Sequence, residues 1–220
     1  MKDLKPHKGA FYLHRLIAEG EHEHQDFKYS VSDARKIARS ISAFANNGGG
    51  RLLIGVKDNG VIAGVRNEED IYVVETAGSI YCRPPQEVSF TAYRAEGGEV
   101  VFVAEIAESD VKPIMVAESD GTLRAYYRVN DENIVASPLM VENWNRNRRE
   151  DTAVLRLSAA ENSLLHRLES GVMLTIDDYM KLSHISRRTA EMSASHLLSM
   201  GIVRMVYDGH QWRLARATAL

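Results

Sequence analysis

The sequence predicts an α+β protein of two domains: a mixed, largely antiparallel sheet with packed helices, then a small domain of three helices and a hairpin. Two observations predict this architecture. In the first part, apolar segments with helical spacing alternate with strand-sized apolar runs and tight turns, whereas the last part holds three capped helical segments and one hairpin. The segment between them, ENWNRNRRED at 142–151, is polar and lacks both periodicities. We therefore expect one domain at 1–145, a linker at 146–152 and a second domain at 153–220.

Composition places the chain among ordinary soluble proteins. It has 220 residues, of which 45% are hydrophobic and 26% charged, values that exclude the disordered and fibrous classes. No apolar run approaches the roughly 18 residues needed to span a bilayer, and the start MKDLKPHKG is not followed by the apolar segment of a secretion signal. Cys82 is the only cysteine, which excludes an internal disulfide. We expect a cytoplasmic protein without a membrane partner.

The net charge of −3 is divided between the two parts. From Asp151 onward, 8 basic and 7 acidic residues give +1, which leaves −4 for residues 1–150. Neither part is basic enough to attract nucleic acid by its total charge. Any contact with nucleic acid therefore requires a local basic patch.

In the first domain, helical spacing and turn residues mark the elements. Helices are expected at 11–19, at 34–45 with Ser32 as the cap, and after the cap Asn67 as far as Tyr81. Continuous or alternating apolar runs bounded by Gly, Asn and Asp predict strands. These are Leu52–Val56, Val61–Val65, Val88–Tyr93, Val100–Ala107, Ile114–Glu118 and Leu123–Val129.

In the second domain, Ser158, Thr175 and Ser186 each precede a segment with helical spacing. Gly201 ends the third helix, and the strands Ile202–Tyr207 and Gln211–Leu214 flank an Asp-Gly turn. Three helices followed by a two-stranded hairpin is the order of a winged helix-turn-helix domain.

The third helix of this domain carries the candidate nucleic-acid-binding residues Ser186, Arg187, Arg188 and Thr189 in its first turn. Arginines at a helix N-terminus can meet phosphates and guanine edges in a major groove. The segment ISRRTAEMSASHLLSMGIV resembles the recognition helix and first wing strand of bacterial winged-helix regulators. The resemblance implies DNA as the partner. The alternative is a winged helix used for dimerisation or for docking another protein, with both arginines solvated.

Motifs of the first domain resemble the Schlafen AlbA_2 family, also called the divergent AAA-4 group, over about residues 12–145. They are E-x4-D-F-K beginning at Glu21, the run ISAFANNGGGRLLIGVKDNGVIAGV, the pair Lys112-Pro113, and YYRV at 126–129 continuing to Ser137. The sequence departs from the family pattern at Asp26, where Glu is usual, and at Asn130, where Gly is usual.

The resemblance implies a candidate catalytic and metal site. In eukaryotic Schlafen relatives, three carboxylates form a metal-assisted ribonuclease site, and they correspond here to Glu21, Asp26 and Asp58. Three convergent carboxylates can hold Mg²⁺ or Mn²⁺ and activate water. Glu21 and Asp26 have opposite strand parity, so the chain must bend between them. The alternative is structural: a strand at Asp26 and a turn residue at Asp58.

Three further features have structural alternatives. His22 and His24 are alternate residues on a predicted strand, where they could be transition-metal ligands or simply form an exposed polar edge. Cys82 has no activating base and is expected to be buried. The run Gly48–Gly50 leads from helix into strand and lacks a following Lys-Ser or Lys-Thr, whereas a phosphate loop leads from strand into helix. ATP is therefore not expected as a cofactor.

These observations predict a bacterial-type transcriptional regulator that binds nucleic acid through its winged helix, forms a homodimer and is not an enzyme. The first alternative is a metal-dependent ribonuclease that uses Glu21, Asp26 and Asp58. The second is an ATP-binding or protein-interaction module.

Overall fold

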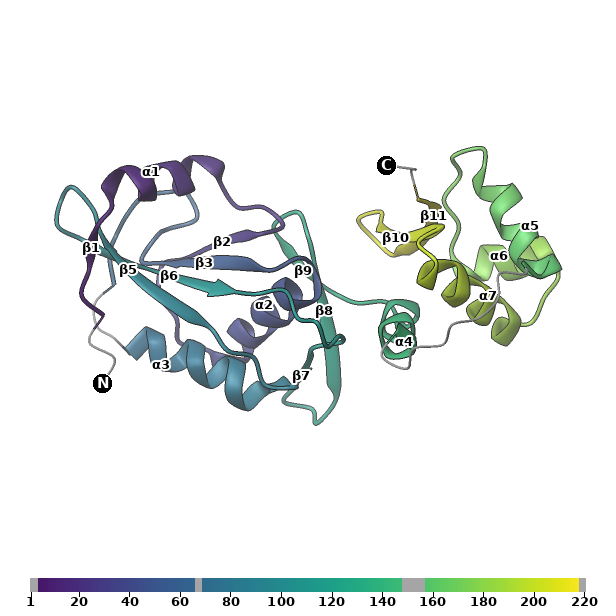
Figure 1. The fold of residues 1–220 in the computed structure, drawn as a ribbon, viewed down its shortest axis with the longest axis horizontal. Helices are drawn as coiled ribbons and strands as arrows, with labels where there is room; N and C mark the ends of the chain where they lie inside the picture. Colours follow the sequence, from purple (N-terminus) through teal and green to yellow (C-terminus); the bar gives the residue numbers. More distant parts are fainter. Residues whose placement is uncertain (1–3, 66–68, 148–156, 218–220) are drawn as a thin grey trace. The chain divides into compact units, whose positions relative to one another are not determined.

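The computed structural model describes residues 4–65, 69–147 and 157–217 (Figure 1). The chain divides into two compact units, Met1–Ala136 and Ser137–Leu220. This division differs from the expected boundary at residue 145, because helix α4 (Pro138–Asn147) packs against a helix of the second unit. Its Leu139 is buried in that unit's core, although the boundary expected from the sequence places this residue in the first domain. Residues 146 and 147 of that linker belong to α4, and residues 148–152 lie outside the described residues.

The first unit contains the mixed sheet that the sequence predicts, in the order β1-β5-β6-β3-β2. Its inner strands pair antiparallel, while the edge strands β1 and β2 each pair parallel to their neighbour. Its strands in chain order are β1 (His7–Lys8), β2 (Gln25–Lys28), β3 (Gly50–Ile54), β5 (Ser89–Arg94) and β6 (Val100–Ile106).

Helices cover both faces of this sheet (Figure 1). On one face, Leu13 and Leu16 of α1 (Ala10–Glu19) pack on Leu53 of β3. On the other face, Leu52 packs into a larger core with α2 (Ala34–Asn46) and α3 (Glu69–Thr76), which continues as a wider helical turn to Tyr81. Successive residues of β3 thus face opposite helices, as the alternation of a strand requires.

A second antiparallel sheet of four strands packs on the far side of α2, where the sequence predicts a single sheet. Its order is β4-β7-β8-β9, with β4 (Cys82–Arg83), β7 (Met115–Ala117), β8 (Leu123–Val129) and β9 (Glu132–Val135). Strand β9 was not predicted, and the expected strand Val61–Val65 forms only an isolated bridge between Val56 and Ile62. Cys82 is fully buried, as predicted.

Helix α2 holds the second sheet through buried polar side chains. Ile114 donates its backbone N–H to Asn46 Oδ1 at 2.8 Å, and Asn46 Nδ2 donates to the carbonyls of Ile114 and Tyr126. Ser42 Oγ donates to Ile114 O at 2.7 Å and accepts from Tyr126 N. Buried backbone groups need such partners. The Ser and Asn of the ISAFAN motif therefore have a structural role.

Two predicted helix caps of the first unit, Ser32 and Asn67, are not confirmed by the structure. Asp33, not Ser32, caps α2, since Asp33 Oδ1 accepts from Arg35 N and Lys36 N. The expected cap Asn67 lies outside the described residues.

The glycine run after α2 is explained by close packing. A side chain at Gly50 would place its Cβ 2.3 Å from the Phe44 ring, and one at Gly49 would lie 2.9 Å from Ile106 O. Gly49 also has a φ of +79°, which favours glycine.

The second unit contains the predicted three helices and hairpin in the predicted order. Leu174 forms an antiparallel bridge with Leu214, which adds a short third strand to the hairpin. Its elements after α4 are α5 (Ala159–Leu168), α6 (Ile176–Ser183), α7 (Arg187–Ser199), β10 (Val203–Tyr207) and β11 (Trp212–Arg216). Ser158, Thr175 and Ser186 cap the three helices as predicted. Among the residues described, no helix is both long enough and apolar enough to cross a membrane.

A buried arginine links the two sheets of the first unit. Arg128 of β8 is 1% exposed. Its guanidinium donates to His22 O and Gln25 O, each at 3.4 Å, and to Asn133 Oδ1 at 2.9 Å. The same group lies 3.4 Å from Asp26 Oδ1. Since Gln25 and Asp26 belong to β2, this side chain fixes the edge strand of one sheet to the other.

Replacing Arg128 with Met should destabilise the first unit by about 3–5 kcal/mol, because Asp26 and two backbone carbonyls lose a buried cationic partner. Urea denaturation followed by circular dichroism measures this loss. The matched control is Arg124→Met in the same strand, whose ion pair with Asp120 is exposed and contributes at most about 1 kcal/mol. Equal losses in the two variants would contradict this role for Arg128.

Candidate functional site

The first two carboxylates of the predicted site come together because the chain turns sharply between them. His22 N donates to Gln25 O at 3.0 Å, and Gln25 N donates to His22 O at 3.1 Å. This turn lays Glu21 beside β2, where Glu21 Oε1 accepts from Phe27 N at 2.8 Å. The bend that the parity of Glu21 and Asp26 requires is therefore present.

Side chains cap the open edge of β2. Arg51 N of the neighbouring strand donates to His24 O, so the backbone groups of Gln25 and Phe27 point away from the sheet. Glu21 accepts from Phe27 N, and Lys28 Nζ donates to Phe27 O at 2.9 Å. Arg128 and the turn supply the partners of Gln25. An edge strand satisfied in this way cannot pair with another strand.

Asp26 already has two cationic partners. Its carboxylate lies 2.7 Å from Lys28 Nζ and 3.4 Å from Arg128 Nη2, and the residue is 4% exposed. Burial raises the pKa of Glu21, and the adjacent Asp26 side chain raises it further, while the N–H of Phe27 opposes the shift. Glu21 and Asp26 therefore form a carboxyl pair whose charge Lys28 and Arg128 compensate.

The third predicted carboxylate lies elsewhere. Asp58 is exposed in the turn after β3. Throughout the described part of the chain, no group of three or more His, Cys, Asp or Glu side chains is placed to hold a metal ion. A divalent cation at Asp26 would also have to displace Lys28 and Arg128. The residues present therefore do not fit a Mg²⁺ or Mn²⁺ site.

The histidines of the first motif and the cysteine have structural surroundings. His22 Nδ1 accepts from His24 N at 3.1 Å, and His24 Nδ1 donates to Gly49 O at 2.8 Å. Burial raises the pKa of the Cys82 thiol to about 12, so the reactive thiolate is suppressed.

The predicted nucleic-acid-binding residues occupy the first turn of α7. Ser186 Oγ accepts from Thr189 N at 3.1 Å and hydrogen-bonds the Thr189 hydroxyl at 2.8 Å, so both hydroxyls belong to the cap. Arg187 forms ion pairs with Asp177 of α6 and with Glu191, the latter at 3.2 Å. Arg188 is exposed and forms no hydrogen bond or ion pair with any described residue.

The two arginines therefore differ in a way that the RR sequence does not reveal. Arg187 is neutralised within its own unit, whereas the guanidinium of Arg188 is available to a partner. The local sequence signal for this pairing is Glu191, four residues after Arg187 on the same helix face, whereas Asp177 lies ten residues earlier on another helix.

Comparisons with known proteins identify the family of the first unit. The family model described as Schlafen, AlbA_2 matches residues 21–137, more than half of the chain. A crystal structure of the DIP2311 protein from Corynebacterium diphtheriae is similar at 17% identity and a TM-score of 0.46; the match covers 95% of this chain and 50% of that one. The chain thus spans about half the length of that protein.

The N-terminal domain of a RecG-related protein from Nitrosomonas europaea is similar at 20% identity and a TM-score of 0.43, with 68% of this chain and 95% of that one covered. A comparison with curated proteins found no match. The segment that the family model matches includes the E-x4-D-F-K motif, the glycine run and Arg128. On this match, the chain belongs to the Schlafen AlbA_2 family.

Proposed function

We propose that this protein is a DNA-binding transcriptional regulator whose second unit is a winged helix with α7 as the recognition helix. The order of the elements supports this proposal. Helix α5, the bridge residue Leu174, helices α6 and α7, and the hairpin β10–β11 follow one another as in winged-helix domains. The hairpin then corresponds to the wing.

Arg188 is the observation that carries the proposal. It lies in the first turn of a 13-residue helix, where unpaired backbone N–H groups and the helix dipole favour a phosphate. A guanidinium there can pair with a phosphate or with the O6 and N7 atoms of guanine. Arg188 has no competing partner among the described residues, whereas Arg187 has two.

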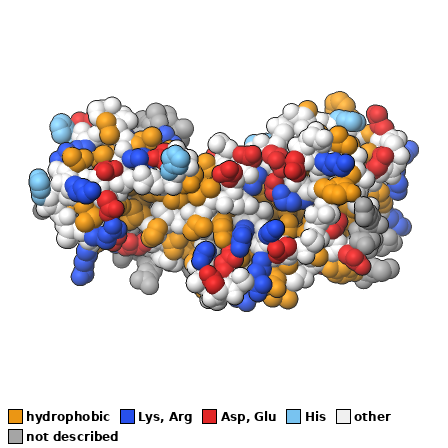
Figure 2. Space-filling model, turned by 180° about the vertical axis from the view of Figure 1, so that it is seen from behind, with side chains coloured by type: hydrophobic (Ala, Val, Ile, Leu, Met, Phe, Trp, Pro, Cys, Tyr) orange, Lys and Arg blue, Asp and Glu red, His pale blue; other side chains and the backbone are white. Residues whose placement is uncertain are grey.

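The distribution of charge explains why the proposed contact with DNA must be local. Acidic and basic side chains are interspersed on the face shown in Figure 2, without a broad area of one sign. The total charge of −3 gives no general attraction for a polyanion. Affinity must therefore come from a few placed contacts, and the loss of one should be measurable.

Replacing Arg188 with Ala should weaken duplex binding about tenfold, because one charge-assisted contact is lost. The slope of log K against log salt should fall by about 0.9 in magnitude, as expected for one phosphate contact. Fluorescence anisotropy with a labelled duplex at several salt concentrations measures both quantities. Arg187→Ala should have a smaller effect.

The matched control is Arg94→Ala, which removes the same charge from β5 of the first unit. It should leave affinity and slope unchanged. An unchanged affinity in a folded Arg188→Ala variant would remove DNA binding from α7 and favour a docking or dimerisation role for the second unit.

We further propose that the protein acts as a homodimer. Each chain offers one recognition helix, and its unit has little charge with which to strengthen a single contact. A symmetric dimer supplies a second reader about 34 Å away along the duplex, and tethering makes the second contact intramolecular. Sedimentation equilibrium at micromolar concentration should give twice the 24.6 kDa chain mass. A monomeric mass with and without duplex DNA would be incompatible with this proposal.

The nuclease alternative is not favoured, since Asp58 is apart from the carboxyl pair and Asp26 is ion-paired. Structured RNA incubated with the protein and Mn²⁺ should therefore show no cleavage above a Glu21→Ala, Asp58→Ala control. Gel analysis of end-labelled RNA measures the difference. Mn²⁺-dependent cleavage that disappears in the control would establish the nuclease function instead.

A further inference from the structure

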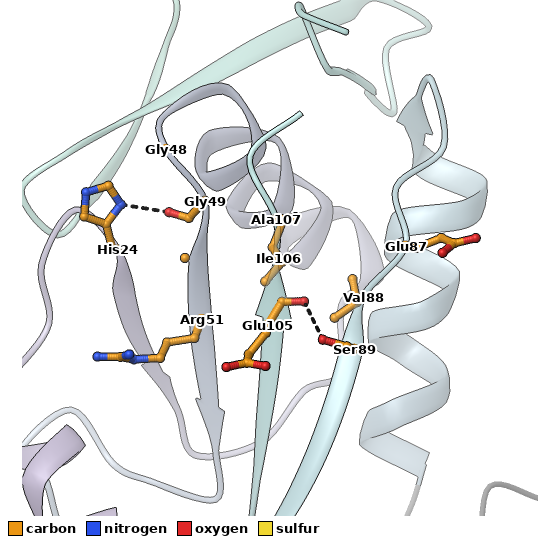
Figure 3. A pocket seen from close by; sticks show the side chains of 11 residues that line it. His24, Gly48, Gly49, Arg51, Glu87, Val88, Ser89, Glu105, Ile106 and Ala107 are labelled. Carbon is orange, nitrogen blue, oxygen red and sulfur yellow. Dashed lines mark hydrogen bonds between the residues drawn. The ribbon is translucent and has the colours of Figure 1, made fainter. Parts of the chain in front are cut away.

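A cavity of about 580 Å³ opens at one end of the five-stranded sheet (Figure 3). Here β2, β3 and β5 begin and β6 ends, beyond the part of the sheet that α1 covers. Its size suits a small molecule. The lining combines polar side chains with the glycine run and a short apolar wall of Val88, Ile106 and Ala107.

Three hydrogen-bond donors at this cavity, Gly49 N and two nitrogens of Arg51, are already engaged. Gly49 N donates to Phe44 O at 2.9 Å, and the pKa of the nearby Glu108 carboxyl is lowered by Lys112 and, to a smaller extent, by the Gly48 backbone. Arg51 Nε donates to Gln25 Oε1 at 2.7 Å, and its Nη2 pairs with Glu19. Gly49 N, Arg51 Nε and Arg51 Nη2 are therefore not free to bind a phosphate.

Acceptors remain free. Glu105 is the cross-strand neighbour of Arg51 and of Ser89, so the three side chains share one face of the sheet. The expected pair between Glu105 and Arg51 does not form, because Arg51 turns to β2 and Glu19. The Glu105 carboxylate has no hydrogen bond or ion pair with a described residue.

His24 also lines the cavity. A carbonyl only accepts, so His24 Nδ1 is the donor in the contact with Gly49 O. In Figure 3, Arg51 and Glu105 extend on the same side of the sheet, while Glu87 projects away from them.

We propose that this cavity binds a small organic cation: a primary ammonium group carried on a short aliphatic stem. Glu105 receives the ammonium, the Ser89 hydroxyl provides a neighbouring acceptor, and the stem lies along exposed Ala107. An ammonium supplies three donors and no acceptor, which matches a lining whose donors are engaged and whose carboxylate is free. The inference is independent of DNA binding by α7.

Isothermal titration calorimetry at low ionic strength tests the site with 1,4-diaminobutane as the probe. The wild-type protein should bind one equivalent, and Glu105→Gln should weaken binding at least tenfold, because the charge-assisted contacts are lost. The control Glu132→Gln removes the same charge from exposed β9, in the other sheet, and should bind as the wild type does.

A second variant changes the shape of the cavity without changing its charge. Ala107 is exposed on the apolar wall, so Ala107→Leu should preserve the fold, as thermal melts would verify, while narrowing the cavity and reducing affinity. Nα-acetyl-lysine methylamide forms a second arm, which separates a free amine from a lysine side chain as the source of the ammonium. Whichever of the two amines, 1,4-diaminobutane or the lysine derivative, binds more tightly identifies the source of the ammonium group.

Neutral 1,4-butanediol and inorganic phosphate should not bind. Equal affinity of the diamine for wild type and Glu105→Gln, or the absence of binding by both amines at millimolar concentration, would overturn the proposal. Phosphate binding that is lost in Arg51→Gln would also overturn it and establish an anion site.

Discussion

The arrangement of the first unit depends on the burial of Arg128. A guanidinium at 1% exposure is tolerated only when its charge and its donors are compensated. Carbonyls of the turn and of β2, the Asn133 amide and the Asp26 carboxylate provide that compensation, and the Phe44 ring lies 5.2 Å from the guanidinium. These partners come from β2, β9 and α2, so one side chain holds three elements around β8.

The same constraint explains the first family motif. Once Arg128 and the turn engage Gln25, only Phe27 still presents unpaired backbone groups on the open edge of β2, and Glu21 and Lys28 satisfy them. The Asp26 carboxylate then pairs with Lys28 and Arg128. The spacing E-x4-D-F-K is thus what an edge strand needs when a buried arginine lies behind it. In this chain, each of the four named motif residues has a structural contact.

Local patterns predicted the fold well where the signal lies within a few residues. Strand Leu123–Val129 and the three caps of the second unit agree with the structure, because alternation, side-chain caps and turns are local. Strand β9 and helix α4 were missed, since pairing with β8 and packing on α7 override a polar sequence. The separation of the sheets and the 103-residue contact between Gln25 and Arg128 are equally non-local. Asn130, unexpected beside the family pattern, adopts the positive φ that explains why glycine is usual there.

In the candidate sites too, the role of a charged side chain depends on its partners, which the residue type alone does not reveal. Sequence shows Arg51, Arg128, Arg187 and Arg188 as equivalent cations. In the structure, Arg128 is a buried support, Arg51 is held by Gln25 and Glu19, and Arg187 is neutralised by Asp177 and Glu191. Arg188 alone of these four lacks a partner among the described residues, just as Glu105 lacks the Arg51 that its register predicts. Both proposals rest on a charged side chain that has no partner among the described residues, at a place where a neighbouring charge is paired. The sign of each unpaired charge then determines the proposed ligand, an anion at α7 and a cation at the end of the sheet.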